Sequence, residues 1–268
     1  MRNMLSFLLS VHPVFLAFLA GCFTFFITLL GSALVLLFKK MNSCILNIML
    51  ALSAGIMISA SFFSLLNPAI EIANEFHFHT WFIVLSGFLI GGLFLYGGDS
   101  FIDFLSCHYS FPTHMKRAIL LFSSITLHNI PEGLVLGVAY GAILFSSNSM
   151  GALLSALCLT IGIAIQNFPE GSAISLPLYK DGFSLKKSFI LGSLSAIVEP
   201  FFAVLGAILV TSVQVLLPFI MSFTAGAMIF VVLMELLPEL LQQKKRNLFS
   251  IMVMIGFAIM MVLEIILG

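Results

Sequence analysis

Two similar stretches decide how this chain folds: T-L-H-N-I-P-E-G at residues 126–133 and I-Q-N-F-P-E-G at residues 165–171. Each places a metal-capable or hydrogen-bonding side chain four residues before a glutamate, so the two side chains share one face of a helix. Both stretches lie deep inside long apolar runs. An ionisable side chain at membrane depth costs about 2.5 kcal/mol or more and normally faces a bundle interior, a partner or an ion path. The stretches therefore indicate a functional site inside a membrane.

The composition indicates an integral membrane protein. Of the 268 residues, 61% are hydrophobic and only 8% are charged, and the mean hydropathy is +1.19. An ordinary soluble domain has about 25% charged residues, so that class is excluded. The formal net charge is zero, which gives no reason to expect a nucleic-acid partner. The expected partner is the lipid bilayer.

Eight apolar runs are long enough to cross a hydrocarbon core about 30 Å thick, which takes about 20 helical residues. We therefore predict an all-α polytopic membrane protein whose eight transmembrane helices form a single domain over residues 1–268. The predicted spans are 14–38, 45–68, 80–104, 118–142, 151–177, 188–212, 215–240 and 248–267.

The first of these runs allows a different interpretation, because L-A-G-C at residues 19–22 resembles the cleavage site of a lipoprotein signal peptide. Apolar sequence continues from Phe23 to Phe38, where a mature lipoprotein usually turns polar, and His12-Pro13 interrupts the supposed signal core. We expect a membrane span here instead.

The basic residues fall in alternate connections between the spans. Of the 11 lysines and arginines, only Arg2 lies on the opposite side. Short cytoplasmic loops carry the excess of Lys and Arg, so we predict a multi-pass protein of the cell membrane (inner or plasma) with both termini outside. The basic connections hold Lys39-Lys40, Lys116-Arg117, Lys180 with Lys186-Lys187, and Lys244-Lys245-Arg246.

With this topology the fourth span runs outward and the fifth runs inward, yet both carry N-x-P-E-G near mid-depth. Like motifs on antiparallel neighbours predict a pseudo-two-fold axis in the membrane plane, and hence an inverted-repeat helix bundle of the kind that recurs in transporters. Pro131 and Pro169 cannot donate the usual helix hydrogen bond. We therefore expect both helices to be interrupted at these prolines.

Imidazole, carboxylate and amide groups collect at this depth, and such groups suit a divalent ion such as Zn²⁺. His128, Glu132, Gln166 and Glu170, with Met57 of the second span, form one predicted mixed site. For His128 or Gln166 alone, a hydrogen bond between helices is an equal alternative. Packing explains Met57 equally well. The matched pair of motifs favours the metal site.

A second, adjacent ion position is predicted from Asn129, Asn167 and Glu199, which would share Glu132 and Glu170 with the first. Three carboxylates carry a charge of minus three, against plus two for one ion or plus four for two, so either occupancy leaves about one unit of imbalance. An empty cluster is expected to hold protons, which metal binding releases.

Acidic residues continue from the middle of the membrane toward the cytoplasm. Glu235 lies in the seventh span, Asp99 and Asp103 lie in the cytoplasmic half of the third, and Glu239 lies at the inner mouth. Glu264 of the eighth span is expected at the outer end, in interfacial water.

Five motifs carry a family resemblance: H-N-I-P-E-G at 128–133, Q-N-F-P-E-G at 166–171, E-P at 199–200, A-G-I-M ending at Met57, and E-L-L-P-E at 235–239. With them the chain resembles the ZIP family of divalent metal transporters, in its GufA-type branch, over essentially all eight spans. The resemblance implies an inner bundle of spans two, four, five and seven, a midplane metal centre, and uptake of zinc, with iron, manganese and cadmium as further ions.

By motif position, the resemblance implies metal roles for Met57, His128, Asn129, Glu132, Gln166, Asn167, Glu170 and Glu199, and it assigns Glu235 to the exit path. The chain departs from the family in two respects. Gln166 stands where many ZIP members have histidine, and the long histidine-rich loop between spans three and four is reduced to a short segment with His108 and His114. A cytoplasmic metal sensor of the usual size is therefore not expected.

We expect a secondary transporter that imports zinc or a similar divalent ion, with no enzymatic activity and no resident cofactor. No Walker-type loop for ATP is present in the sequence. An intramembrane metalloenzyme is the rival hypothesis, since a metal held by His and Glu activates water, but no H-E-x-x-H occurs. A non-transporting metal receptor would differ only in flux. The oligomeric state stays open, with a homodimer as one candidate.

Overall fold

The computed structural model describes the backbone of residues 2–37, 43–75, 79–108, 113–212 and 216–267. These residues are almost wholly helical and contain no β-strand, so the predicted all-α fold is confirmed. The elements are α1 (Arg2–Ser10), α2 (Pro13–Ser32), α3 (Leu34–Leu37), α4 (Ser43–Ala60), η1 (Ser61–Leu66), α5 (Asn67–Glu75), α6 (Thr80–His108), α7 (Thr113–Ala142), η2 (Ile143–Phe145), α8 (Ser149–Lys180), α9 (Leu185–Leu194), α10 (Val198–Ser212), α11 (Leu217–Val231), η4 (Val232–Leu236), α12 (Leu237–Leu241) and α13 (Arg246–Leu267).

Eight stretches within the described residues are long and apolar enough to cross a membrane, as predicted. Several of them join two or three of the shorter elements end to end. In order, they are Pro13–Leu37, Ser43–Asn74, Thr80–Ile102, Leu121–Phe145, Ser149–Lys180, Leu185–Thr211, Leu217–Met234 and Arg246–Ile266.

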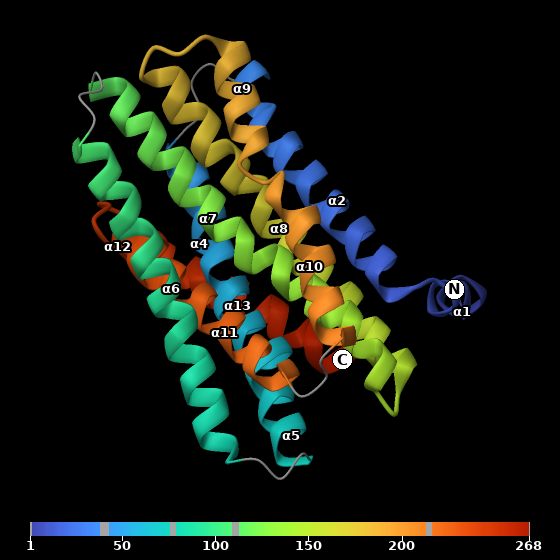
Figure 1. The fold of residues 1–268 in the computed structure, drawn as a ribbon. Helices are drawn as coiled ribbons and strands as arrows, with labels where there is room; N and C mark the ends of the chain where they lie inside the picture. The colour runs from blue at the N-terminus through green and yellow to red at the C-terminus, as the bar shows by residue number, and fades with distance from the viewer. Residues whose placement is uncertain (1, 38–42, 76–78, 109–112, 213–215, 268) are drawn as a thin grey trace.

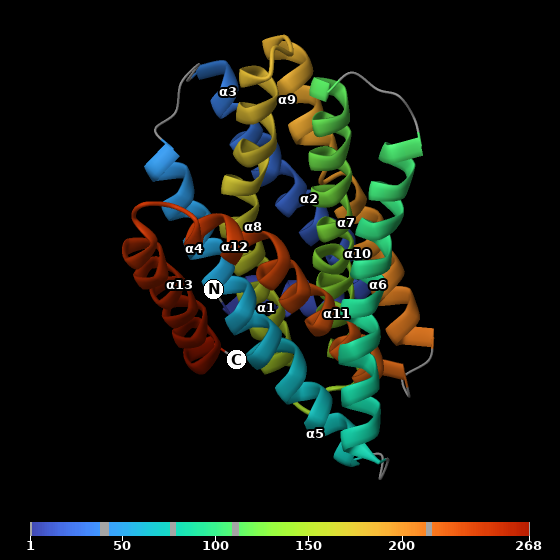
Figure 2. The ribbon, with the colours of Figure 1, turned by 90° about the vertical axis from the view of Figure 1, so that its left-hand side faces the viewer.

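The helices pack in two groups of four that repeat one pattern. The first group consists of two matching pairs, α2 with α8 and α10 with α7. The second group also consists of two matching pairs, α4 with α13 and α11 with α6. Between the groups, α4 contacts α8 and α11 contacts α7. In Figure 2, α13 and α6 lie at opposite edges of the molecule. Each of these contacts thus has a counterpart, which is the pattern that an inverted repeat produces.

Glycines bring paired helices into backbone contact. A Cβ atom on Gly91 of α6 would lie only 1.9 Å from the carbonyl oxygen of Phe223 in α11. A Cβ on Gly226 of α11 would lie 1.9 Å from the carbonyl oxygen of Phe88 in α6. The two glycines are reciprocal, and only the absence of both side chains lets these backbones approach so closely. The α4–α13 pair repeats the arrangement with Gly55 and Gly256.

Two spans contain a π-helical turn directly before a proline. In η1 the N–H of Asn67 donates to the carbonyl of Phe62, five residues back, and Pro68 follows. In η4 the N–H of Leu237 donates to the carbonyl of Val232, again five residues back, and a proline follows. Such a turn admits the proline ring without ending the span.

The expected interruptions at Pro131 and Pro169 are not found. Both prolines lie inside continuous helices, α7 and α8. A proline removes one backbone hydrogen bond, and the neighbouring helices of the bundle hold the rest of the helix in place. The sixth span breaks instead: α9 ends at Leu194 and α10 begins at Val198, just before Pro200.

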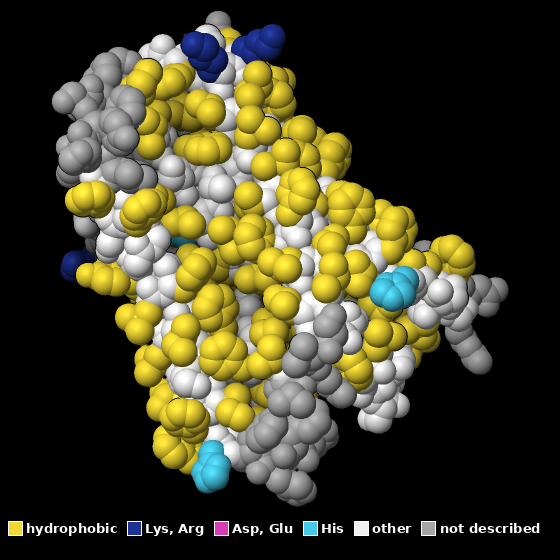
Figure 3. Space-filling model, viewed as in Figure 1, with side chains coloured by type: hydrophobic (Ala, Val, Ile, Leu, Met, Phe, Trp, Pro, Cys, Tyr) yellow, Lys and Arg dark blue, Asp and Glu magenta, His cyan; other side chains and the backbone are white. Residues whose placement is uncertain are grey.

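The surface is apolar along the spans. Figure 3 shows hydrophobic side chains over most of one face, with Lys and Arg side chains only at its upper end and left edge. Figures 1 and 2 show that the upper end is where α6 ends, α7 begins and α9 lies. This is the end at which the sequence predicts the basic cytoplasmic loops.

Candidate metal centre

The two motif helices, α7 and α8, run antiparallel through the middle of the molecule (Figures 1 and 2). The 3.6-residue period of a helix places His128 and Glu132 on one face of α7, and Gln166 and Glu170 on one face of α8. All four side chains are buried. The sequence therefore brings an imidazole, two carboxylates and an amide into the interior of the bundle.

Gln166 and Glu132 join the two helices directly. Gln166 Nε2 donates a hydrogen bond to Glu132 Oε1 at 2.5 Å. The other oxygen of each side chain, Gln166 Oε1 and Glu132 Oε2, is buried and has no hydrogen-bond partner. Unpaired buried oxygens are costly, and two of them here are suited to coordinate a cation.

A second hydrogen-bonded group lies next to the first in sequence. Asn167 Nδ2 donates to Glu199 Oε1 at 2.9 Å, and the hydroxyl of Thr24 donates to Glu199 Oε2. Asn167 Oδ1 and both amide atoms of Asn129 are buried without a hydrogen-bond partner. The asparagines thus add further unpaired oxygens close to the two motifs.

The break in the sixth span places Glu199. Residues 195–197 form a turn between α9 and α10, and Glu199 lies in the first turn of α10. Its carboxylate is fully buried. The N-terminus of a helix carries a partial positive charge, which stabilises a carboxylate there. A discontinuous span with its helix end inside the protein is the arrangement that transporters use at ion sites.

Met57 is buried in α4. Ser53, one turn earlier on the same face of α4, donates its hydroxyl to the backbone carbonyl of Gln166 at 3.3 Å. Met57 also belongs to the main apolar core. Its position suits both alternatives that the sequence left open.

The side chains of several predicted acidic residues fall outside the described part of the structure. Glu235 lies in η4, but its side chain is outside the described part of the structure, as are those of Asp103 and Glu239. Asp99 is half-buried in α6. Among the side chains that the structure describes, no three His, Cys, Asp or Glu residues lie close enough to hold a metal ion by themselves. The predicted ligands His128, Glu132 and Glu170 are thus all buried, but the structure does not bring them together as one such group.

Comparison with known proteins places the chain in a family. The family model for ZIP zinc transporters matches residues 106–264, which is more than half of the chain. The chain belongs to the ZIP zinc transporter family. The resemblance predicted from the motifs is thereby confirmed.

Two relatives of this ZIP family chain align with it nearly end to end, and a third aligns with about two thirds of it. Zinc transporter ZIP11 of Homo sapiens is 32% identical over a 337-residue alignment that covers 95% of this chain and 98% of the human protein. Zinc transporter ZIPB of Bordetella bronchiseptica is 31% identical, over 94% of this chain and 81% of its own length. Zinc transporter GufA of Myxococcus xanthus is 30% identical, over 69% of this chain and 71% of its own length. The first alignment is longer than 268 residues, so the human protein carries insertions that this chain lacks.

The expected exposure of Glu264 in this ZIP family chain is wrong. It is buried rather than in interfacial water. Ser64 of η1 donates its hydroxyl to Glu264 Oε1, and Ser155 of α8 donates to Glu264 Oε2 at 3.3 Å. Because η1 and α8 both contact Glu264 of α13, its carboxylate is shielded from water, although its position in the sequence suggested exposure.

Sequence reasoning missed Thr24 and Ser53, which contact residues of the centre. Neither belongs to a motif, and both lie in otherwise apolar spans. A hydroxyl in a transmembrane helix usually hydrogen-bonds across helices or back to its own backbone. That signal marks every Ser and Thr in the spans equally, so it does not select these two.

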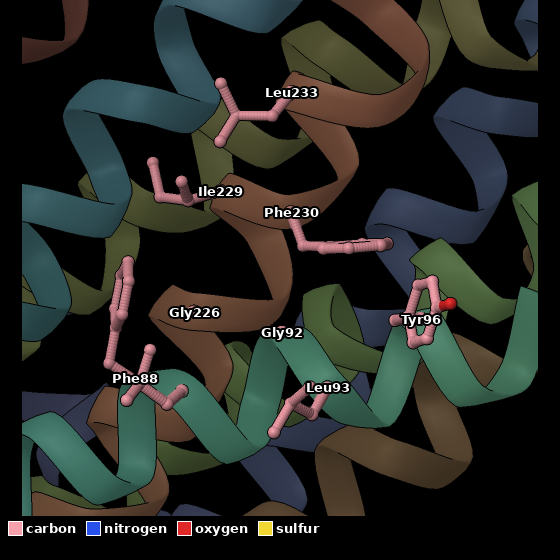
Figure 4. Close-up of a pocket in the computed structure, with 9 residues that line it drawn as sticks. Phe88, Gly92, Leu93, Tyr96, Gly226, Ile229, Phe230 and Leu233 are labelled. Atoms are coloured by element: carbon pink, nitrogen blue, oxygen red, sulfur yellow. The ribbon is translucent and has the colours of Figure 1, made fainter.

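An apolar groove of about 420 Å³ lies away from the centre, between α6 and α11. Figure 4 shows its aromatic side chains, Phe88 and Tyr96 of α6 and Phe230 of α11. It contains none of the predicted metal ligands and borders side chains that are exposed on the apolar surface. The lining residues are Phe88, Leu89, Gly92, Leu93, Tyr96, Gly226, Ile229, Phe230 and Leu233.

Proposed function

We propose that this protein is a secondary transporter that imports zinc, or a similar divalent ion, into the cytoplasm through a metal centre in the middle of the membrane. One observation supports it most: Gln166 of α8 donates a buried hydrogen bond to Glu132 of the antiparallel helix α7. Each of these two side chains keeps one buried oxygen without a hydrogen-bond partner. Membership of the zinc transporter family supports the same activity, and the relatives named above are all called zinc transporters.

The first ion position is formed by His128, Glu132, Gln166 and Glu170, with Met57 as a thioether ligand. Imidazole and carboxylate are ordinary zinc ligands. Amide oxygen is a harder ligand that Mn²⁺ also accepts, and thioether suits softer ions such as Cd²⁺. This mixed set is consistent with zinc as the main substrate and with iron, manganese and cadmium as further ions.

The second ion position is formed by Asn129, Asn167 and Glu199, which share Glu132 and Glu170 with the first. The number of bound ions is measured on purified protein by elemental analysis after zinc loading and gel filtration. Two ions per chain in the wild type, and one in Asn129→Ala, support two positions. One ion per chain in both proteins contradicts the second position.

Import is favoured by the arrangement of acidic residues. Asp99 and Asp103 lie in the half of α6 nearer the predicted cytoplasmic end, and Glu235 and Glu239 lie toward the end of the seventh span. Acidic residues on one side of a site attract cations to that side. An ion released from the centre is therefore drawn toward the cytoplasm.

Transport is tested with purified protein in lipid vesicles that contain a zinc-sensitive dye. External zinc should raise the dye signal in wild-type vesicles and leave it unchanged in protein-free vesicles. The measurement is repeated over several pH gradients, because carboxylates that hold protons in the empty centre release them when a metal binds. A protein that binds zinc but produces no flux under any gradient is a receptor, and that result overturns the proposal.

A further inference from the structure

Thr24 of α2 contacts the metal centre although no motif marks it. Its hydroxyl lies within hydrogen-bond distance of Glu199 Oε2 and, at 3.1 Å, of the backbone carbonyl of Gly21 in its own helix. Asn167 Nδ2 donates to Glu199 Oε1 at 2.9 Å. All three side chains are fully buried. Both oxygens of the Glu199 carboxylate are thus held by neutral donors from two other helices, α2 and α8.

The hydrogen bond to Glu199 fixes the orientation of Asn167. A side-chain amide has an N–H end and an oxygen end, and holding one end sets the direction of the other. With Nδ2 bonded to Glu199, Asn167 Oδ1 faces elsewhere, and this oxygen is buried without a hydrogen-bond partner. Gln166 repeats the pattern: Nε2 bonds to Glu132, and Oε1 is unpaired.

We propose that Thr24 is a positioning residue of the metal centre. It holds Glu199, a ligand of the proposed second ion position, and through Glu199 it keeps the amide oxygen of Asn167 available to the ion. The inference rests on the proposed function, since it concerns the same centre. Thr24 acts through Glu199 and is not itself assigned as a ligand. Partners of this kind, one step removed from a metal, set the orientation of the groups that bind it.

Close backbone packing holds Thr24 in place. Gly21 lies one turn before Thr24 on the same face of α2, and a Cβ on Gly21 would lie 2.8 Å from Cα of Pro200. On the other side, a Cβ on Gly133 of α7 would lie 2.6 Å from the backbone oxygen of Glu199. The start of α10 is therefore enclosed between α2 and α7, which fixes the distance from the hydroxyl to the carboxylate.

The chain offers a matched control in Thr28. It lies one turn after Thr24 in the same helix and is also buried. Its hydroxyl donates to the backbone carbonyl of Thr24 at 3.2 Å. Thr24→Val and Thr28→Val remove the same atoms from the same helix and keep nearly the same volume, so their difference reports the contact with Glu199.

The test measures zinc affinity by calorimetry on purified protein, and the zinc dependence of flux in vesicles. Thr24→Val should weaken zinc binding about tenfold, at the lower end of the 10- to 100-fold loss typical of such partners, and should raise KM by a similar factor. Thr24→Ser keeps the hydroxyl and should bind zinc as the wild type does. Thr28→Val should leave affinity and KM unchanged. Thermal stability in detergent is recorded for each variant.

A double-mutant cycle with Glu199→Gln separates positioning from packing, because residues that act as one unit are not additive. On that background, Thr24→Val should weaken zinc binding by clearly less than the tenfold expected in the wild type. The inference would be overturned if Thr24→Val and Thr28→Val lost zinc affinity equally. It would also be overturned if Thr24→Val lost as much zinc affinity on the Glu199→Gln background as in the wild type. A wild type that neither binds nor transports zinc would overturn the proposed function, and with it this inference, before any variant is compared.

Discussion

At the residue scale, the centre uses its two side-chain amides in the same way. Gln166 and Asn167 are adjacent in α8, and each donates its N–H end to a buried glutamate on a different helix, Glu132 of α7 and Glu199 of α10. Each amide keeps a buried oxygen without a hydrogen-bond partner. The hydrogen bonds offset part of the cost of burying the polar groups, while the oxygens stay available to an ion.

Glu132 and Glu170 are expected to be the least replaceable residues. Glu132→Ala or Glu170→Ala removes a negative charge and an oxygen ligand from a site that water replaces poorly. Zinc flux should fall by more than about 100-fold, beyond the loss typical of residues one step removed from a metal. Vesicle flux at equal protein content measures the effect. Glu71→Ala, at an exposed position of α5, is the control and should transport normally. Normal transport by both site variants would mean that the centre is wrongly assigned.

Gln166→His should retain metal binding and shift the preference toward zinc. Imidazole is a better ligand for a borderline ion than an amide oxygen is. The measurement is competition between Zn²⁺ and Mn²⁺ for the purified protein, expressed as the ratio of the two affinities. A ratio equal to that of the wild type would show that residue 166 does not contact the ion.

The sequence predicts most of the polar residues in the centre but not the contacts among them. Helical spacing places His128 with Glu132 and Gln166 with Glu170, because that spacing depends only on the local period. The bond from Thr24 to Glu199 depends on how α2 packs on the broken sixth span. No local pattern contains that information.

At the element scale, prolines have different effects in different surroundings. The sequence predicts interruptions at Pro131 and Pro169, yet α7 and α8 continue through both. Pro68 follows a π-helical turn, and Pro200 follows a break between two helices. A proline costs a helix about 3 kcal/mol, and packing against the neighbouring helices decides whether the span absorbs that cost. Single-sequence reasoning has no access to those neighbours.

Two glycines of α6 that look alike in sequence should behave differently when replaced. A Cβ on Gly91 would lie 1.9 Å from the carbonyl oxygen of Phe223, whereas a Cβ on Gly97 would meet nothing within 4 Å. Gly91→Ala must push α6 and α11 apart and should destabilise the protein by about 1–3 kcal/mol. Gly97→Ala should be neutral or slightly stabilising, because alanine favours a helix more than glycine does. Thermal unfolding in detergent compares the two, and equal stability would contradict the close approach.

At the scale of the whole molecule, the pairing of spans is not readable from hydropathy. A face that contacts lipid and a face that contacts another helix are equally apolar, so the packing partner leaves little trace in composition. The duplicated motifs predict the relation between α7 and α8. The matching pairs α6 with α11 and α4 with α13 emerge only from the structure.

The direction of insertion decides which side of the membrane the acidic residues face, and it can be measured. The basic connections should lie in the cytoplasm, because short cytoplasmic loops carry the excess of Lys and Arg. On a background with all four cysteines replaced, Ser184→Cys, exposed between α8 and α9, should react with a membrane-impermeant maleimide only from the cytoplasmic side. Glu71→Cys, exposed in α5, should react only from outside, and a permeant maleimide should label both. The reverse pattern would place Asp99, Asp103, Glu235 and Glu239 toward the outside, which would contradict the predicted topology and remove their support for import.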